Sequence, residues 1–258
     1  MKAKPSSIER VDIFPRTVVL DRRQTLHYAL ATLGIALGSP LLSGCSDSSD
    51  SGAARSRELQ APDENGVALP EGYTSRIVAR STQPVEGTSF TWHNAPDGGA
   101  CFDAGDGGWI YVSNSELGDN DGGAGALRFN ADGKLIDAYS VLQGTSRNCS
   151  GGATPWGTWL SCEEIDSGRV WECDPQGVES ATVRPALGVF RHEAVAVDSL
   201  NRKLYLAEDQ GDGCLYRFTP FNYPNLTAGK LEAARSISGE TGEVEWLEIL
   251  DPLASSAE

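Results

Sequence analysis

Short apolar runs, rich in aromatic and β-branched residues and each followed by a turn, make up most of the chain beyond residue 100. No long segment repeats its apolar residues with the period of an α-helix. The 29 glycines and 13 prolines fall between the apolar runs at turn spacing, which is typical of strands and disfavours a helical bundle or an α/β fold. The pattern therefore predicts an all-β protein.

The strands recur as a repeated unit. Each copy is a strand, a turn and a second strand, and successive copies lie about 45 residues apart. The three copies pair residues 111–116 with 127–133, 159–164 with 170–177, and 205–210 with 215–220. A repeat of this length predicts a β-propeller whose blades have four strands each, whereas an all-β sandwich, the main alternative, would not require self-similar segments.

The first 44 residues differ from the rest of the chain. Arg22 and Arg23 precede an apolar stretch over residues 28–42, which is too short and too weakly apolar to span a membrane as a helix. This stretch leads into Leu42-Ser43-Gly44-Cys45, the pattern at which bacterial lipoproteins are cleaved and lipidated. We predict an export signal over residues 1–44, with the twin-arginine translocase as its partner and Cys45 as the lipidated residue.

The export signal indicates where the folded part works. Residues 45–68 begin with a stretch rich in Ser, Asp, Gly and Ala, which predicts a flexible tether between the lipid and a domain over residues 69–258. Ser46 after the lipidated cysteine favours the outer membrane. We therefore expect an exported bacterial lipoprotein on the periplasmic face of a membrane, with the outer membrane favoured, or at the cell surface.

The charge balance limits the partners. The chain has 21 basic and 36 acidic residues and a formal net charge of −15 at pH 7, and the export signal has an excess of basic residues. An acidic domain disfavours binding to nucleic acid or to an anionic lipid surface through a basic patch. It suits a protein that binds cations, although scattered surface carboxylates more often serve solubility.

Potential cation ligands stand at the end of the first strand in each copy of the repeat. They are Asn114 and Glu116, Glu163 and Glu164, and Glu208 and Asp209. In a propeller, equivalent strand ends of successive blades point toward the same end of the central channel, so we expect these side chains to converge. Converging carboxylates would bind a hard cation such as Ca²⁺, the alternative being that they cap strands and face solvent.

The stretch from Asn148 to Glu164 places Cys149 in a glycine-rich loop, ahead of Thr-Pro-Trp-Gly-Thr at 154–158 and Cys-Glu-Glu at 162–164. With His-Glu-Ala at 192–194 and Glu-Asp at 208–209, it resembles the PhoX-type alkaline phosphatases over about residues 90–220. The resemblance implies a six-bladed β-propeller, exported through the twin-arginine pathway. It also implies hydrolysis of a small phosphate ester by a calcium and iron cluster at the mouth of the channel.

The resemblance further implies roles for single residues. Cys149 matches the family's iron-binding cysteine, Glu193 lies in its His-Glu-Ala ligand motif, and Glu163 and Glu164 are the acids of its Cys-Glu-Glu motif. The expected cofactors are Ca²⁺ and Fe³⁺. The expected metal ligands are Asn114, Glu116, Cys149, Glu163, Glu164, Glu193, Glu208 and Asp209.

The expected catalysis depends mainly on the metals. A phosphate ester carries negative charge, so a nucleophile approaches it only where metal ions neutralise the oxygens and activate a bound water. Neither His93 nor His192 lies in a nucleophile-elbow motif, and we expect no catalytic triad. His192 and Glu193 are the expected catalytic residues, with His192 contacting phosphate or orienting the carboxylate. A buried, packed histidine is the alternative for His192, and His93 is expected to be structural.

The cysteines suggest a disulfide. Lipidation of Cys45 leaves an odd number of cysteines for an oxidising compartment. If Cys149 binds iron, Cys162 and Cys173 on one hairpin form the expected bridge, and the remaining pair, Cys101 and Cys214, follows only by elimination. Free buried thiols are the alternative.

Length sets the remaining expectations. Residues 69–258 hold about four blades at this period, fewer than the six of the family, so we expect a propeller incomplete at its C-terminus and active only if further blades are supplied. The competing functions are a calcium-binding or lactonase-like propeller without phosphatase activity, and an inactive truncated family member. The Cys149 thiol discriminates, because a calcium site made of oxygen ligands has no use for it.

Overall fold

The computed structural model describes residues 58–237 and 243–254. The chain divides into two compact units, and the described residues of the larger one begin at Val78. The predicted export signal, Cys45 and most of the predicted tether lie outside the described residues, so these assignments remain predictions. Among the described residues, no helix is long and apolar enough to cross a membrane.

Residues 58–77, the described part of the smaller unit, form turns that one carboxylate ties together. Asp63 Oδ1 accepts hydrogen bonds from the N–H groups of Asn65 and Val67 at 2.9 and 3.0 Å, and Oδ2 accepts one from the Ser75 hydroxyl. An isolated antiparallel bridge joins Leu59 to Pro70. No longer strand forms between residues 58 and 77.

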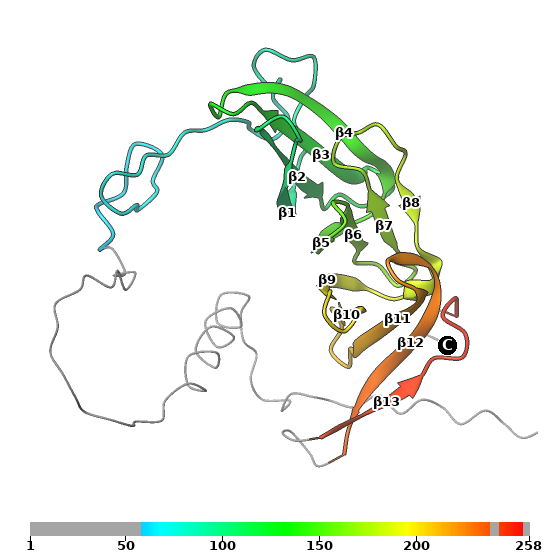
Figure 1. Cartoon of the computed structure of the whole chain (residues 1–258). Helices are drawn as coiled ribbons and strands as arrows, with labels where there is room; N and C mark the ends of the chain where they lie inside the picture. Colours follow the sequence, from blue (N-terminus) through cyan, green and yellow to red (C-terminus); the bar gives the residue numbers. More distant parts are fainter. Residues whose placement is uncertain (1–57, 238–242, 255–258) are drawn as a thin grey trace, which may run out of the picture. The chain divides into compact units, whose positions relative to one another are not determined.

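The described residues of the larger unit form three antiparallel sheets (Figure 1). The first contains β1 (Pro96–Asp103), β2 (Trp109–Ser115), β3 (Gly122–Phe129) and β4 (Leu135–Thr145). The second contains β5 (Asn148–Ala153), β6 (Trp159–Glu163), β7 (Val170–Cys173) and β8 (Thr182–Val183). The third contains β9 (His192–Asp198), β10 (Lys203–Glu208), β11 (Leu215–Asn222), β12 (Asn225–Ser236) and β13 (Val244–Glu248). The 3-10 turn η1 (Pro185–Leu187) is the only helical element in the described residues, which confirms the predicted all-β class.

The strands of each sheet follow one another in chain order. The first strands lie side by side, because β5 contacts both β1 and β9. The three predicted hairpins are the second and third strands of the three sheets, β2–β3, β6–β7 and β10–β11, and each pair is antiparallel. The repeated unit predicted from the sequence is therefore the central hairpin of each sheet.

Three apolar clusters hold these sheets. The first, which includes Leu160 and Phe218, lies between the second and third sheets. The second, which includes Val112 and Trp159, lies between the first and second sheets. On the other face of the first sheet, Trp92 and its neighbours in the preceding segment pack against β3.

The described residues form three sheets where the chain length predicted about four blades. Residues 78–95 supply side chains that cover the first sheet and form no sheet of their own. At the other end, β13 extends the third sheet as a fifth strand. The residues that the length estimate assigned to a fourth blade therefore cover the first sheet or extend the third.

The prediction of a glycine-rich loop around Cys149 is wrong, because residues 148–153 form strand β5. Its glycines allow close approach of the neighbouring backbones. A Cβ on Gly151 would lie 1.9 Å from the Leu160 carbonyl oxygen, and one on Gly152 would lie 2.0 Å from the Val195 carbonyl oxygen. Glycine within a strand often marks such an approach.

The predicted disulfide between Cys162 and Cys173 is also wrong. Cys162 pairs with Val170 in the register of β6 and β7, and Cys173 pairs with Trp159. The two thiols belong to different apolar clusters, so they lie on opposite faces of the sheet. The free cysteines of the described residues are Cys101, Cys149, Cys162, Cys173 and Cys214.

Candidate metal site

Each sheet has an irregularity near the start of its first strand. The register of β1 with β2 shifts between Pro96 and Gly99, and that of β5 with β6 shifts between Asn148 and Gly151. The register of β9 with β10 shifts next to His192. A β-bulge of this kind inserts one residue and redirects the side chains. The second residue of each first strand lies in its bulge: Asp97, Cys149 and Glu193.

An acidic residue follows directly after the second strand of each sheet. These residues are Glu116 after β2, Glu164 after β6 and Asp209 after β10. Their N–H groups donate to the carbonyl oxygens of Ala95, Arg147 and Arg191 at 2.9, 2.9 and 3.0 Å. Each of these carbonyls belongs to the residue just before a first strand, so the same backbone bond sets the acid beside the bulge in all three sheets.

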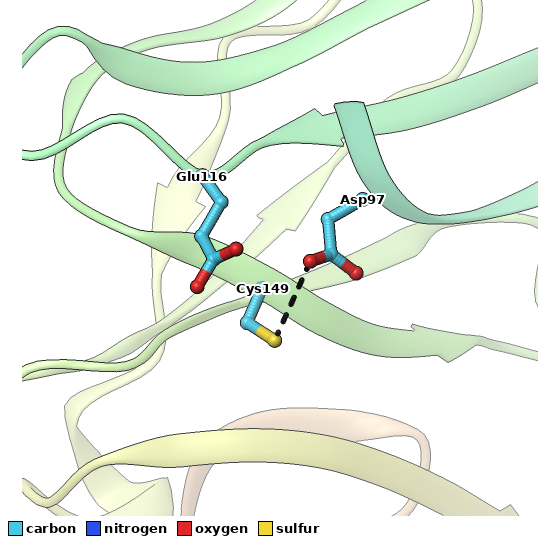
Figure 2. Close-up of side chains that lie close together, drawn as sticks. All are labelled: Asp97, Glu116 and Cys149. Carbon is cyan, nitrogen blue, oxygen red and sulfur yellow. Dashed lines mark hydrogen bonds between the residues drawn. The ribbon is translucent and has the colours of Figure 1, made fainter. Parts of the chain in front are cut away.

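Cys149 lies at the centre of these residues. Its Sγ is 3.3 Å from Glu193 Oε2 and 3.9 Å from Asp97 Oδ2, and Figure 2 shows Asp97 and Glu116 on either side of its side chain. One ligand atom from each of Asp97, Glu116 and Cys149 lies within 4.8 Å of the others, and the same is true of Cys149, Glu164 and Glu193. Cys149 therefore belongs to two groups of three possible metal ligands.

The cluster concentrates groups that are negative when ionised. Burial raises the pKa of the Cys149 thiol, and the carboxylates of Glu193 and Asp97 raise it further. Burial, followed by a hydrogen bond with Asp209, raises the pKa of Glu164 to about 7. Glu164 Oε2 is buried without a hydrogen-bond partner among the described residues. A bound cation would favour the ionised form of every one of these groups, so the arrangement fits a cation site.

The donor set suits two kinds of cation. Carboxylate oxygens are the ligands that Ca²⁺ prefers, whereas a thiolate favours a transition metal such as iron. The site contains both kinds of donor. Cys149 supplies the thiol, and the carboxylates come from Asp97 and Glu116 in one group and from Glu164 and Glu193 in the other. The residues present therefore fit the calcium and iron that the family resemblance implies.

Four of the predicted metal ligands converge in these two groups, namely Glu116, Cys149, Glu164 and Glu193. Asp209 adjoins them through its hydrogen bond with Glu164. Glu163 and Glu208 are buried at the ends of β6 and β10 and belong to neither group. Their carboxylates accept hydrogen bonds from protein groups.

Asn114 lies behind Cys149 and binds protein groups. Its Nδ2 donates to the carbonyl oxygens of Cys149 and Ser150 at 3.2 and 2.8 Å. Its Oδ1 accepts hydrogen bonds from Trp159 Nε1 and the Ser161 hydroxyl at 2.9 and 2.8 Å. The side chain therefore holds the bulge that carries Cys149, and its service as a metal ligand remains a prediction.

His192 is fully buried beneath the site. Its Nε2 is 3.2 Å from the Gly188 carbonyl oxygen, and its ring packs against Phe190 with 3.7 Å between centroids. Burial lowers the pKa of His192 to about 3, so the imidazole is neutral in the folded protein. This placement is the buried, packed alternative considered for His192, and its neighbour Glu193 is the residue that reaches the cluster.

Sequence reasoning missed Asp97. The repeat was recognised from the second and third strands, and Asp97 lies in a first strand, within the run Pro96-Asp-Gly-Gly99 that resembles a turn. Aligning the starts of β1, β5 and β9 provides the signal, because Asp97, Cys149 and Glu193 are then equivalent.

A pocket of about 440 Å³ opens beside Glu164. It is lined by Arg147, Glu164, Ile165, Asp166 and Arg191. Arg191 Nε lies 2.6 Å from Asp166 Oδ1 in an exposed ion pair. Arg147 directly precedes β5 and Arg191 directly precedes β9. A guanidinium group therefore stands just before each of the two bulges that carry Cys149 and Glu193. Guanidinium groups bind the oxygens of phosphate well, often through two hydrogen bonds.

The comparisons with known proteins identify the family of the chain. The family model described as alkaline phosphatase PhoX matches residues 121–171 and 166–258. The matched part contains Cys149, Glu164, Glu193 and Asp209, while the first sheet's Asp97 and Glu116 precede it. No curated protein and no solved structure matches the chain. With more than half of its residues matched, including those at the centre of the cluster, the chain belongs to the PhoX alkaline phosphatase family.

Proposed function

We propose that the protein is a metal-dependent phosphatase that hydrolyses small phosphate esters with bound Ca²⁺ and Fe³⁺. The observation that carries this proposal is the position of Cys149, whose sulfur is shared by two groups of carboxylate ligands. Family membership supports the phosphatase activity. The nature of the donors supports the choice of metals.

The proposed metal ligands divide between the two groups. Asp97 and Glu116 would hold a cation on one side of Cys149, and Glu164 and Glu193 would hold one on the other. Asp209, hydrogen-bonded to Glu164, would complete the second side. When bound, the metals would neutralise ester oxygens and lower the pKa of a bound water.

The residues of the chain would orient the substrate. Arg147 and Arg191 line the pocket beside Glu164, where a phosphate group would find two guanidiniums next to the metal ligands. Glu193 would act at the reacting end as both ligand and catalytic residue. The buried His192 would fix the start of β9, through its contact with Gly188, and thereby orient Glu193.

We also propose that the three sheets are blades of a β-propeller, six-bladed as the family resemblance implies. The chain order of strands within each sheet and the neighbouring positions of β1, β5 and β9 support this arrangement. In a propeller the first strand of each blade lines the central channel, where the three bulges would then meet.

The location follows from the N-terminal sequence. We propose that the twin-arginine translocase exports the protein and that lipid on Cys45 anchors it to the periplasmic face of a membrane, with the outer membrane favoured. We also propose that the protein does not bind nucleic acid, because its net charge of −15 would repel the phosphate backbone.

The decisive experiment compares the full-length protein with Cys149→Ser. Metal analysis and hydrolysis of p-nitrophenyl phosphate in the presence of Ca²⁺ should find iron and calcium in the wild type. The variant should lose iron, with activity at least about 100-fold lower, because a removed ligand matters at least as much as its supporting groups. Cys101→Ser, which changes an exposed thiol in β1, should retain both.

Three outcomes would contradict the proposal in different ways. Wild-type protein without iron would exclude the mixed-metal site. Calcium binding without iron or phosphatase activity would favour the calcium-binding or lactonase-like alternative. Iron and calcium bound without activity would favour an inactive family member.

A further inference from the structure

We infer that Glu163 and Glu208 are positioning residues, each fixing the strand end that carries the following acid, Glu164 or Asp209. The inference rests on the proposed function, because it concerns the ligands of the proposed metals. It assigns to the two buried glutamates a role different from the direct metal binding expected from the sequence.

Glu163 is fully occupied by protein donors. Its Oε1 accepts a hydrogen bond from the Ser146 N–H at 3.0 Å. Its Oε2 accepts bonds from the Arg169 N–H at 3.2 Å and from Trp171 Nε1 at 3.1 Å. The residue is 7% exposed, and a buried carboxylate is tolerated only when hydrogen bonds replace its lost hydration. These three donors therefore hold the carboxylate in one place.

Glu208 repeats two of these contacts in the third sheet, while its Oε1 is buried without a hydrogen-bond partner among the described residues. Its Oε2 accepts hydrogen bonds from the Cys214 N–H and the Tyr216 hydroxyl, both at 3.0 Å. In both sheets one donor is a backbone N–H six residues after the glutamate, and another is an aromatic side chain eight residues after it. Because the same contacts recur at the same spacing in two sheets, they are a regular feature of the repeated unit.

The anchored glutamate determines where the next side chain points. Successive side chains of a strand point to opposite faces, so fixing Glu163 in the core directs Glu164 away from it. The N–H of Glu164 is bound in addition to the Arg147 carbonyl, and that of Asp209 to the Arg191 carbonyl. Each acid is therefore attached to the first strand by its backbone and to the third strand through its neighbour.

The first sheet marks the limit of this arrangement. There Ser115 takes the place of the glutamate, and its hydroxyl donates to the Asn94 carbonyl oxygen at 2.8 Å. The buried carboxylate thus occurs in the two sheets whose acids, Glu164 and Asp209, are neighbours. Adjacent carboxylates repel each other when both are ionised, so they need firm support to stay together, and the two glutamates provide it.

The experiment uses Glu163→Gln and Glu208→Met. In Glu163→Gln the size of the side chain is kept, but its NH₂ group would face an N–H donor whichever way the amide turns, and a hydrogen bond is lost. A glutamine at position 208 could place its NH₂ group where Glu208 Oε1 has no partner and keep both bonds, so methionine, which has a similar length, is used there to remove the acceptor. The matched control is Glu172→Gln at the other end of the second sheet. Glu172 is half-buried and is likewise bound by an indole, Trp156 Nε1 at 2.7 Å, and by Arg184 Nε at 2.7 Å.

Calcium titration of each full-length protein, with thermal unfolding as the readout, gives the calcium concentration at half-saturation. The Tm measured without metal gives the stability of the metal-free protein separately. We expect Glu163→Gln and Glu208→Met to raise the half-saturating concentration by about 10- to 100-fold, as loss of supporting groups does at metal sites. Glu172→Gln should lower the metal-free Tm without changing the half-saturating concentration. Tyr216→Phe, which removes only a hydroxyl, should give a smaller rise and keeps the test informative if Glu163→Gln or Glu208→Met fails to fold.

The outcomes separate the inference from the proposed function. A wild-type protein that binds neither calcium nor iron would overturn the proposed function and the inference with it. A wild type that binds metal, with Glu163→Gln and Glu208→Met, or Tyr216→Phe, binding equally well, would overturn the inference alone. The same holds if Glu172→Gln weakens calcium binding as much as Glu163→Gln does.

Discussion

Cys149 and its equivalents illustrate how single residues set the chemistry of the site. The same position in the three first strands holds Asp97, Cys149 and Glu193. A carboxylate in all three would give an oxygen-only cation site, whereas the central thiol adds a ligand suited to a transition metal. Burial among carboxylates raises the pKa of this thiol, so its ionised form, which is the form that would bind a metal, depends on a nearby cation.

Asp97 provides a prediction at this scale. Asp97→Asn keeps the shape of the side chain but removes a charge 3.9 Å from Cys149 Sγ. We expect the metal affinity to fall by about 10-fold or more, because the carboxylate is a proposed ligand. Calcium titration and iron analysis measure the effect. Asp103→Asn, an exposed residue at the far end of the same strand that binds the Gly105 N–H, should behave as wild type, and equal effects from both changes would exclude a special role for Asp97.

At the scale of the element, the first strands were harder to predict than the hairpins beside them. The segments at β2–β3, β6–β7 and β10–β11 were predicted because their alternating apolar and β-branched residues are visible locally. In contrast, β1 and β5 contain paired glycines, Gly98-Gly99 and Gly151-Gly152, which resemble loops. Their strand conformation depends on neighbouring backbones: a Cβ on Gly98 would lie 2.7 Å from Ser150 Cα. Local sequence does not reveal such contacts.

The close approach of β5 to β9 can be tested by adding one methyl group. In Gly152→Ala the new Cβ would lie 2.0 Å from the Val195 carbonyl oxygen, so the strands must separate. We expect the free energy of unfolding to fall by about 2 kcal/mol, which thermal or chemical unfolding measures. Gly211→Ala places its Cβ where no atom lies within 4 Å and should leave stability nearly unchanged. A Gly152→Ala protein as stable as the wild type would show that β5 and β9 do not pack this closely.

At the scale of the whole molecule, the site depends on bringing distant segments together. Asp97 and Glu193 are the first and the last residue in the sequence of the two groups of possible ligands, and they reach one region because β1, β5 and β9 lie side by side. The sequence repeat predicted this convergence in outline, through the acids after the second strands. It did not predict the number of sheets, because whether a segment such as residues 78–95 covers a sheet or forms one depends on tertiary packing.

The stability of the molecule toward acid depends in part on His93. This side chain packs on Trp92 with 4.2 Å between ring centroids, and burial lowers its pKa to about 4. In the unfolded chain a histidine titrates near pH 6.5, so between about pH 6.5 and 4 the unfolded state binds a proton that the folded state does not. The contribution of His93 is therefore fully present above about pH 6.5 and is lost progressively as the pH falls through this window.

Removing the histidine tests this prediction. Chemical unfolding of wild type and His93→Gln, in the presence of a chelator so that metal binding does not contribute, should be measured at about pH 7.5, 6 and 5. The wild type should lose more stability between the highest and lowest pH than the variant does, because the variant lacks the group that binds the extra proton on unfolding. The remaining pH dependence of the variant comes from its other titrating groups. Identical slopes for the two proteins would mean that His93 is as accessible to protons in the folded protein as in the unfolded chain.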